Sequence, residues 1–196
     1  DADVGIEVER RAGAGGEEGA GDLRGAKHLF HRAKIPAGAV IALDGAGADR
    51  VVHRALGVRR FRVEYHGPGG HSWGAFGVPN PAHAAGTFAA GIAEMAHARR
   101  PRTACSVVRL SGGTSLNAIP QWAWAEVDLR SEDAGALAAL DAELRALAAR
   151  AGDLENGRRA AGTAALTLKV EQIGDRPCGE TSAEHPLVRA AVAAPR

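Results

Sequence analysis

The sequence predicts an α+β fold in which residues 58–175 follow the element order β-α-β-β-α-β. Four segments alternate apolar and polar residues, which is typical of strands, and two repeat apolar residues every three or four positions, which is typical of helices. Segments rich in glycine and proline separate several of them. This order is that of the split βαβ sandwich of ferredoxin-like domains.

The first strand is expected over residues 59–66, where Phe61, Val63 and Tyr65 alternate with polar residues. The Gly-Pro-Gly-Gly sequence at 67–70 ends it. A helix is expected to begin at Asn80-Pro81, because Asn is a good N-cap and Pro a good first helical residue. The apolar residues that continue this helix at the right spacing are Ala85, Phe88, Ile92 and Met95.

The second half of the pattern contains three more strands and a helix. Strands are expected over residues 103–110, 121–130 and 165–173. Trp122 and Trp124 share one face of the second of these, and they are either interface anchors or side chains packed under a helix. The helix between the last two strands is marked by Leu137, Leu140, Leu144 and Leu147.

Two further zones flank this central pattern. Residues 1–57 are rich in Gly and Ala, and residues 176–196 form a short tail. In the first zone we expect a helix over residues 22–33, a short strand over 39–43, and another strand beginning at Val51-Val52. These elements suggest part of an α/β layer with too few strands to close a doubly wound core.

Composition excludes several classes of function. The chain has 196 residues, of which 45% are hydrophobic and 24% charged, as in ordinary globular proteins. Its 24 Lys and Arg against 23 Asp and Glu give nucleic-acid binding no electrostatic support. No apolar run approaches the roughly 20 residues that a membrane span requires. Cys105 and Cys178 form neither a disulfide framework nor a zinc knuckle, so a cytoplasmic location is expected.

Three carboxylates in the first zone are candidates for metal chemistry. Glu17 and Glu18 lie between glycines, and adjacent carboxylates repel unless they share a cation or a proton. In metal-assisted hydrolysis one carboxylate binds the metal and the other accepts a proton from the attacking water. Asp44 follows an apolar run, where α/β proteins place ligands. The simpler interpretations are a solvated acidic turn and a turn-forming Asp before Gly45.

Two polar residues in glycine-rich loops of the central pattern are further candidates. His71 follows Gly69-Gly70, and it could bind a metal, shuttle a proton or donate to an oxyanion, or be a surface histidine in a turn. Asn117 follows Gly112-Gly113 in a loop that lacks the Lys-Ser/Thr of a phosphate-binding loop. Its simplest role is that of a loop cap.

In this order the motifs resemble the dinuclear-zinc amidohydrolases and exopeptidases, a family that includes carboxypeptidase G, aminoacylase, succinyl-diaminopimelate desuccinylase and peptidase T. The matching segments are residues 16–23, 41–45, 69–72, 117–120 and 127–130, with Arg176-Pro177 near the end. The resemblance implies a zinc-binding α/β domain over residues 1–57, a lid domain that mediates dimerisation over 58–175, and a return to the catalytic domain over 176–196.

The resemblance also implies roles for single residues. Glu17 matches the general base, and Glu18 and Asp44 match ligands of a pair of zinc ions. His71 matches a lid histidine that reaches the active site of the other subunit and polarises the scissile carbonyl. Asn117 and Arg130 match residues that hold the substrate, a peptide or an N-acyl amino acid, and the Arg fork suits a carboxylate.

The chain departs from the family pattern in its metal ligands. Two of the usual five zinc-binding side chains are present, and each zinc requires about four ligands. We therefore expect a hydrolase of peptide or N-acyl amide bonds that is inactive as this chain and that forms a homodimer through the lid. The alternatives are a non-catalytic dimerisation module and a small-ligand binding module.

Overall fold

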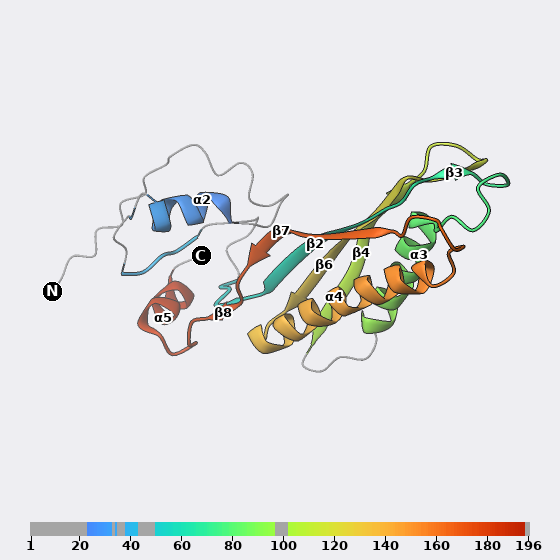
Figure 1. The fold of residues 1–196 in the computed structure, drawn as a ribbon. Helices are drawn as coiled ribbons and strands as arrows, with labels where there is room; N and C mark the ends of the chain where they lie inside the picture. The colour runs from blue at the N-terminus through green and yellow to red at the C-terminus, as the bar shows by residue number, and fades with distance from the viewer. Residues whose placement is uncertain (1–22, 33, 35–37, 43–49, 97–101, 195–196) are drawn as a thin grey trace.

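The computed structural model describes residues 23–32, 34, 38–42, 50–96 and 102–194. Four long strands form the centre: β2 (Gly57–His66), β4 (Thr103–Gly112), β6 (Trp122–Ser131) and β7 (Thr167–Arg176). Their order in the antiparallel sheet is β4-β6-β2-β7. Two helices, α3 (Pro81–Ala96) and α4 (Ala134–Asn156), cover one face of this sheet (Figure 1). The predicted α+β fold with β-α-β-β-α-β order is confirmed.

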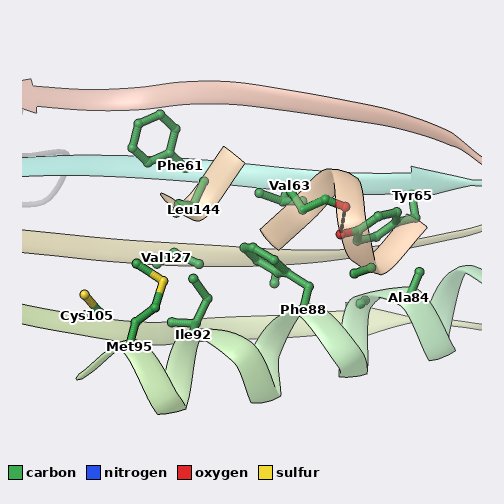
Figure 2. Close-up of a cluster of buried hydrophobic side chains, with 14 of the residues drawn as sticks. Phe61, Val63, Tyr65, Ala84, Phe88, Ile92, Met95, Cys105, Val127 and Leu144 are labelled. Atoms are coloured by element: carbon green, nitrogen blue, oxygen red, sulfur yellow. Dashed lines mark hydrogen bonds between the residues drawn. The ribbon is translucent and has the colours of Figure 1, made fainter. Parts of the chain in front are cut away.

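The core lies between the sheet and the two helices, as Figure 2 shows. The inward residues of β2 are fully buried, and they are the Phe61, Val63 and Tyr65 that the alternation predicted. Phe88 of α3 and Leu144 of α4 pack against them with no exposed area. The Tyr65 hydroxyl donates to the Ala148 carbonyl at 2.8 Å, because a buried hydroxyl requires a partner.

Helices α3 and α4 each begin at a capping side chain, and the start of α3 at Asn80-Pro81 is the one that the sequence predicts. The side chain of Asn80 accepts from the Ala82 N–H at 2.9 Å, ahead of the first turn of α3. Asp133 caps α4 in the same way by accepting from Ala136 N. Helix α3 packs beneath β4 and β6, while α4 packs beneath β2, β6 and β7.

A hairpin-like arm extends the sheet at one end (Figure 1). We define the arm as residues 67–80 and 113–121, which contain β3 (Gly70–His71) and β5 (Ala118–Ile119). These two short strands pair antiparallel, and the Gly67 N–H donates to the Gln121 carbonyl at 2.8 Å. The arm therefore continues the β2–β6 ladder beyond the helices.

Flanking segments occupy the opposite end of the sheet (Figure 1). They contain α2 (Arg24–Lys27), the π-helical η1 (His28–Arg32) and α5 (Pro186–Ala193), and β1 (Arg54–Ala55) pairs with β8 (Gly179–Glu180). The helix expected over residues 22–33 is present as α2 and η1. Among the described helices, none is long and apolar enough to cross a membrane.

Two strand predictions in the flanking segments are wrong. Residues 39–42 form no strand, and residue 43 lies outside the described residues. No described strand pairs with that run, and an extended segment becomes a strand only when its backbone groups find partners. The strand expected at Val51-Val52 is instead the pair Arg54–Ala55.

Candidate functional site

His71 and Asn117 lie side by side on the arm. His71 pairs with Ala118 in the β3–β5 ladder, and the Ser72 N–H donates to the Asn117 carbonyl at 2.8 Å. The two residues are 46 positions apart in sequence, and the structure brings them to one surface. Both are exposed, so a ligand can reach them.

The imidazole of His71 is oriented by its own loop. Its Nδ1 accepts from the backbone N–H groups of Trp73 and Gly74, at 3.2 and 3.3 Å. An Nδ1 that accepts two hydrogen bonds carries no proton in the neutral ring, so the proton is on Nε2. The loop therefore presents an Nε2–H donor to the surroundings, and this is the arrangement that stabilises developing charge on a carbonyl oxygen.

The side chain of Asn117 is also held in place. Its Oδ1 accepts from the Ser115 hydroxyl at 2.7 Å, which leaves the amide Nδ2 as the group that points a donor at a ligand. The arm thus offers two neutral donors in fixed positions.

Arg130 lies at the other end of the sheet. It pairs with Val58 near the start of β2, whereas Trp122 pairs with His66 beside the arm. A strand rises about 3.3 Å per residue, so the eight residues from Trp122 to Arg130 span about 26 Å. Within one chain the structure brings His71 and Asn117 together and keeps Arg130 apart from them.

The environment of Arg130 suits an anion. Its Nε and that of Arg60 both contact the carboxylate of Asp128, so two guanidinium groups share one carboxylate. The Arg130 side chain is 40% exposed, and its terminal nitrogens can still meet a second carboxylate.

The remaining candidates, Glu17, Glu18 and Asp44, lie outside the described residues. Among the residues that are described, no three His, Cys, Asp or Glu side chains gather to hold a metal ion. The donor set for a zinc pair is therefore not met within this part of the chain, and no catalytic step can be assigned to a metal there.

The face of the sheet turned away from the helices, which we call the open face, is lined by charged residues. Trp124 lies on this face, so the alternative of packing under a helix is wrong. The Arg62 and Arg109 guanidinium groups lie 4.0 and 5.3 Å from the centre of its ring, and both also contact Glu126 at 3.1 Å. Trp124 is only 7% exposed, because the two arginines cover it.

Electrostatics on the open face are dominated by paired charges. Arg62 donates to Glu64 at 2.6 Å, and this hydrogen bond holds the pKa of the Glu64 carboxyl below its usual value. His66 adds a contact to Glu64 at 3.2 Å. Because the charges around Trp124 are paired with one another, this part of the open face is a stabilised surface and not an open anion site.

The edge of the sheet at β4 has a different character. Val108 lies at a bulge in this strand and Leu110 lies near its end, and they are 55% and 53% exposed. The adjacent side of α3 is made of small residues. Gly91 of α3 packs against Leu147 of α4. At 3.6 residues per turn, the small residues lie on the side of α3 opposite Gly91. These small residues are Ala82, Gly86, Ala89 and Ala93.

Sequence reasoning missed two residues of the arm, Trp73 and Phe76. Both are 89% exposed and lie in the loop that follows His71. The signal was present in the sequence, since two aromatic residues lie within a glycine-rich loop in a chain with only 4% aromatic residues.

Comparisons with known proteins bear on the family and the fold of the chain. Residues 55–154 match a family described as the peptidase dimerisation domain. Among curated proteins, none matches the sequence. An amidase of the hydantoinase/carbamoylase family from Burkholderia vietnamiensis has a similar structure, with a TM-score of 0.60 and 21% identity, over 70% of this chain and 32% of the other.

A second solved structure gives the same result. The aminobenzoyl-glutamate utilization protein from Klebsiella pneumoniae is similar with a TM-score of 0.57 and 18% identity, over 65% of this chain and 30% of the other. At these identities the likeness establishes a shared fold. The matched part spans about a third of the length of either protein.

Proposed function

Because just over half of its residues match that family, the chain belongs to the peptidase dimerisation domain family, and we propose that it acts as a homodimer in an amide-bond hydrolase. The proposed reaction is hydrolysis of a peptide or N-acyl amide bond. Two observations support it: the similar structures are described as an amidase and an aminobenzoyl-glutamate utilization protein, and the arm presents an oriented donor. The placement of His71 beside Asn117 on the arm carries the proposal.

The dimer surface that we propose is the β4 edge with the neighbouring side of α3. An edge strand leaves one row of backbone groups unpaired, and β4 has exposed Val108 and Leu110 beside it. Gly86 of α3 supports this choice, because a Cβ at this position would meet nothing within 4 Å in the described chain. Glycine inside a helix costs about 0.5–1 kcal/mol relative to Ala, and a close-packed partner helix would offset that cost.

The other edge of the sheet is less suited to this role. Strand β7 carries the exposed ion pair between Lys169 and Glu171, and Lys on an edge strand discourages pairing. Helix α4 beside it has a charged outer surface, including Arg145 and Arg150. Pairing through β7 would therefore bury charges, while pairing through β4 buries small and apolar groups.

A two-fold pair through β4 explains why the candidate site is divided. For α3 to meet its copy, both helices must lie on the same side of the joined sheet, so the two β4 strands run antiparallel. The arm at the end of one β4 then lies beside the start of the partner's β4. Arg130 is at that end, so His71 and Asn117 of one protomer approach Arg130 of the other.

We call His71 and Asn117 of one protomer, together with Arg130 of the other, the composite site, and each of the three residues would have its own role. Arg130 would bind a substrate carboxylate through its terminal nitrogens. The Nε2–H of His71 would donate to the carbonyl oxygen of the scissile amide and stabilise the negative charge that develops on it. Asn117 would orient the same substrate through its amide.

We assign zinc chemistry in the proposed enzyme to the segments that contain Glu17, Glu18 and Asp44. Their similarity to a general base and two metal ligands supports this assignment. Two bound zinc ions would supply a water of lowered pKa as the nucleophile. Since only Glu18 and Asp44 match ligands, we expect the 196-residue chain to be inactive without further donors.

One titration tests these assignments together. The isotope-labelled chain, supplied with zinc, is titrated with an N-acetyl amino acid while amide chemical shifts and product are both monitored. We expect shifts at residues 71–74, at Asn117 and around Arg130, with no hydrolysis. Matched titrations use His71→Ala, which should remove the shifts on the arm, and His53→Ala as a control outside it.

The outcomes are distinct. Shifts confined to other surfaces would contradict the substrate-binding assignments. Hydrolysis by the zinc-supplied chain would contradict the expected inactivity and would support a metal site that includes side chains not assigned here.

A non-catalytic dimerisation module is the second candidate function. The match of residues 55–154 to a peptidase dimerisation domain favours it. In that case the chain forms the same dimer but shows no shifts in the titration.

A further inference from the structure

The loop between α4 and β7 contacts the arm at its base (Figure 1). We call residues 157–166 the brace loop. The Ala160 N–H of this loop donates to the Gly77 carbonyl of the arm at 2.9 Å. A Cβ on Gly67 of the arm would lie only 2.7 Å from Cδ2 of Leu166. The brace loop therefore meets the first arm segment near both of its ends.

The brace loop is itself fastened to the end of α4. Asn156, the last residue of that helix, holds Leu166 through its amide. The Leu166 N–H donates to Oδ1 at 2.7 Å, and Nδ2 donates to the Leu166 carbonyl at 3.3 Å. Glu155 is 6% exposed, and its carboxylate accepts from the Asn80 N–H at 2.8 Å. The end of α4 thus fixes both the brace loop and the point where the arm enters α3.

The close approach at Gly77 requires a glycine. Its φ is +79°, in the left-handed region that favours glycine. A Cβ at this position would overlap the Cβ of Ala160. Gly162 of the brace loop has a similar φ of +83°, but a Cβ there would meet nothing within 4 Å. The two glycines therefore share a backbone conformation and differ in whether an added methyl group would break the contact.

Hydrogen-bonded turns connect Gly77 to His71. The Val78 N–H donates to the Ala75 carbonyl at 3.3 Å, and the Ala75 N–H donates to the His71 carbonyl at 2.8 Å. These turns enclose residues 73–74, whose N–H groups hold Nδ1 of His71. A displacement at Gly77 would therefore move the donors that orient the imidazole.

We propose that the brace loop is a positioning element of the composite site, and that its contact with Gly77 keeps His71 in the orientation that presents Nε2–H. The proposal rests on the proposed function, because the loop acts on the reaction through His71. A donor that is fixed before the substrate binds needs no reorganisation as charge develops on the carbonyl oxygen. The brace loop supplies this fixation without touching the substrate.

The tautomer of His71 tests the proposal without any substrate. Two-bond proton–nitrogen correlation spectra of the labelled full chain are recorded at a pH where imidazoles are neutral, and the His71 signals are assigned with His71→Ala. The wild type should show the Nε2–H form. In Gly77→Ala, the Nδ1 and Nε2 signals should move towards each other as the two tautomers mix. Gly162→Ala, the matched control, should leave both signals at their wild-type positions.

Two further variants separate the contact from the backbone strain. Gly77→Ala combined with Ala160→Gly removes the overlap but keeps the strain, and it should restore most of the wild-type His71 signals. Thr163→Val removes a hydroxyl that lies 3.5 Å from the Gly77 carbonyl, and it should move the same signals by less. The amide signal of Val63, in the buried part of the sheet, shows that each variant keeps its fold.

Affinity for an N-acetyl amino acid is the functional readout. Gly77→Ala should weaken binding about threefold to tenfold, as expected when one hydrogen bond is misaligned. The double variant should recover most of this loss. If the tautomers change as expected but the wild type binds no N-acetyl amino acid, the proposed function is refuted and the positioning role of the loop stands.

Three results would overturn the positioning role itself. His71 signals that are the same in Gly77→Ala as in the wild type would show that the brace loop does not orient the ring. An equal change in Gly162→Ala would show that the contact with Gly77 is not what matters. Failure of the double variant to restore the signals would assign the change to backbone strain at Gly77 alone.

Discussion

Trp124 shows how a single aromatic residue can be buried on a face that no helix covers. Two arginines, Arg62 and Arg109, lie over its ring, and Glu126 holds both of them. The charged groups thus shield an apolar ring and remain paired with one another. At the level of single residues, the open face is stabilised by paired charges where the opposite face is stabilised by apolar packing.

Glu64 provides a test of this arrangement that depends on pH. Its pKa lies below the usual 4.5, first because of the hydrogen bond from Arg62. A lowered pKa in the folded state means that the stabilisation is complete above pH 4.5 and is lost as the pH falls through the lower folded value.

Glu64→Gln should therefore lower the free energy of unfolding by about 1 kcal/mol at neutral pH. The difference from wild type should shrink as the pH is lowered below 4.5. Urea unfolding at several pH values measures this, with Glu171→Gln as an exposed control. If the variant's unfolding free energy lies below that of wild type by the same amount at every pH, the lost stability comes from packing and not from charge.

Two glycines in α3 distinguish an internal helix contact from one that needs a partner. A Cβ on Gly91 would lie 3.0 Å from Cδ2 of Leu147 in α4, while one on Gly86 would meet nothing within 4 Å. The same substitution therefore meets a tight contact at one position and open space at the other.

We expect Gly86→Ala to raise the stability of the monomer by about 0.5–1 kcal/mol, through helix propensity alone. Gly91→Ala should raise the stability of the monomer by less, or lower it, because Leu147 must move to accommodate the added methyl group. Urea unfolding, carried out at the lowest usable protein concentration so that the chain is monomeric, makes this comparison. A larger gain at Gly91 than at Gly86 would contradict the assigned packing of α3 on α4.

At the level of elements, the sequence predicted the parts of the fold that rest on local periodicity. Alternation in residues 59–66 and 121–130 and helical spacing after Asn80 are local signals, and those elements formed. The arm strands β3 and β5 have two residues each, which is too short for any period to appear. The apolar run at 39–42 had a strand composition but no described partner strand.

The candidate site was predictable in its residue types and not in its geometry. The sequence placed His71, Asn117 and Arg130 in loops or strands of the central domain. It could not show that Arg130 lies about 26 Å along β6 from the arm, because that separation depends on the register of β2 with β6. The roles of Glu17, Glu18 and Asp44 stay predictions.

The whole molecule has one end that presents donors and another that presents an arginine. His71 and Asn117 lie on the arm, and Arg130 lies beside the flanking segments. A single chain cannot bring these two ends together, since the sheet between them is continuous. In the proposed assembly, an antiparallel pair through β4 would form two composite sites at once, and this is the central claim.

Sedimentation equilibrium on three chains tests that claim most directly. We expect the wild type to be a dimer and Gly86→Arg, which puts a long charged side chain on the proposed contact side of α3, to be a monomer. Ala142→Arg makes a similar change on the exposed side of α4 and should remain a dimer. A monomeric wild type, or a Gly86→Arg variant that dimerises as tightly as wild type, would contradict the account.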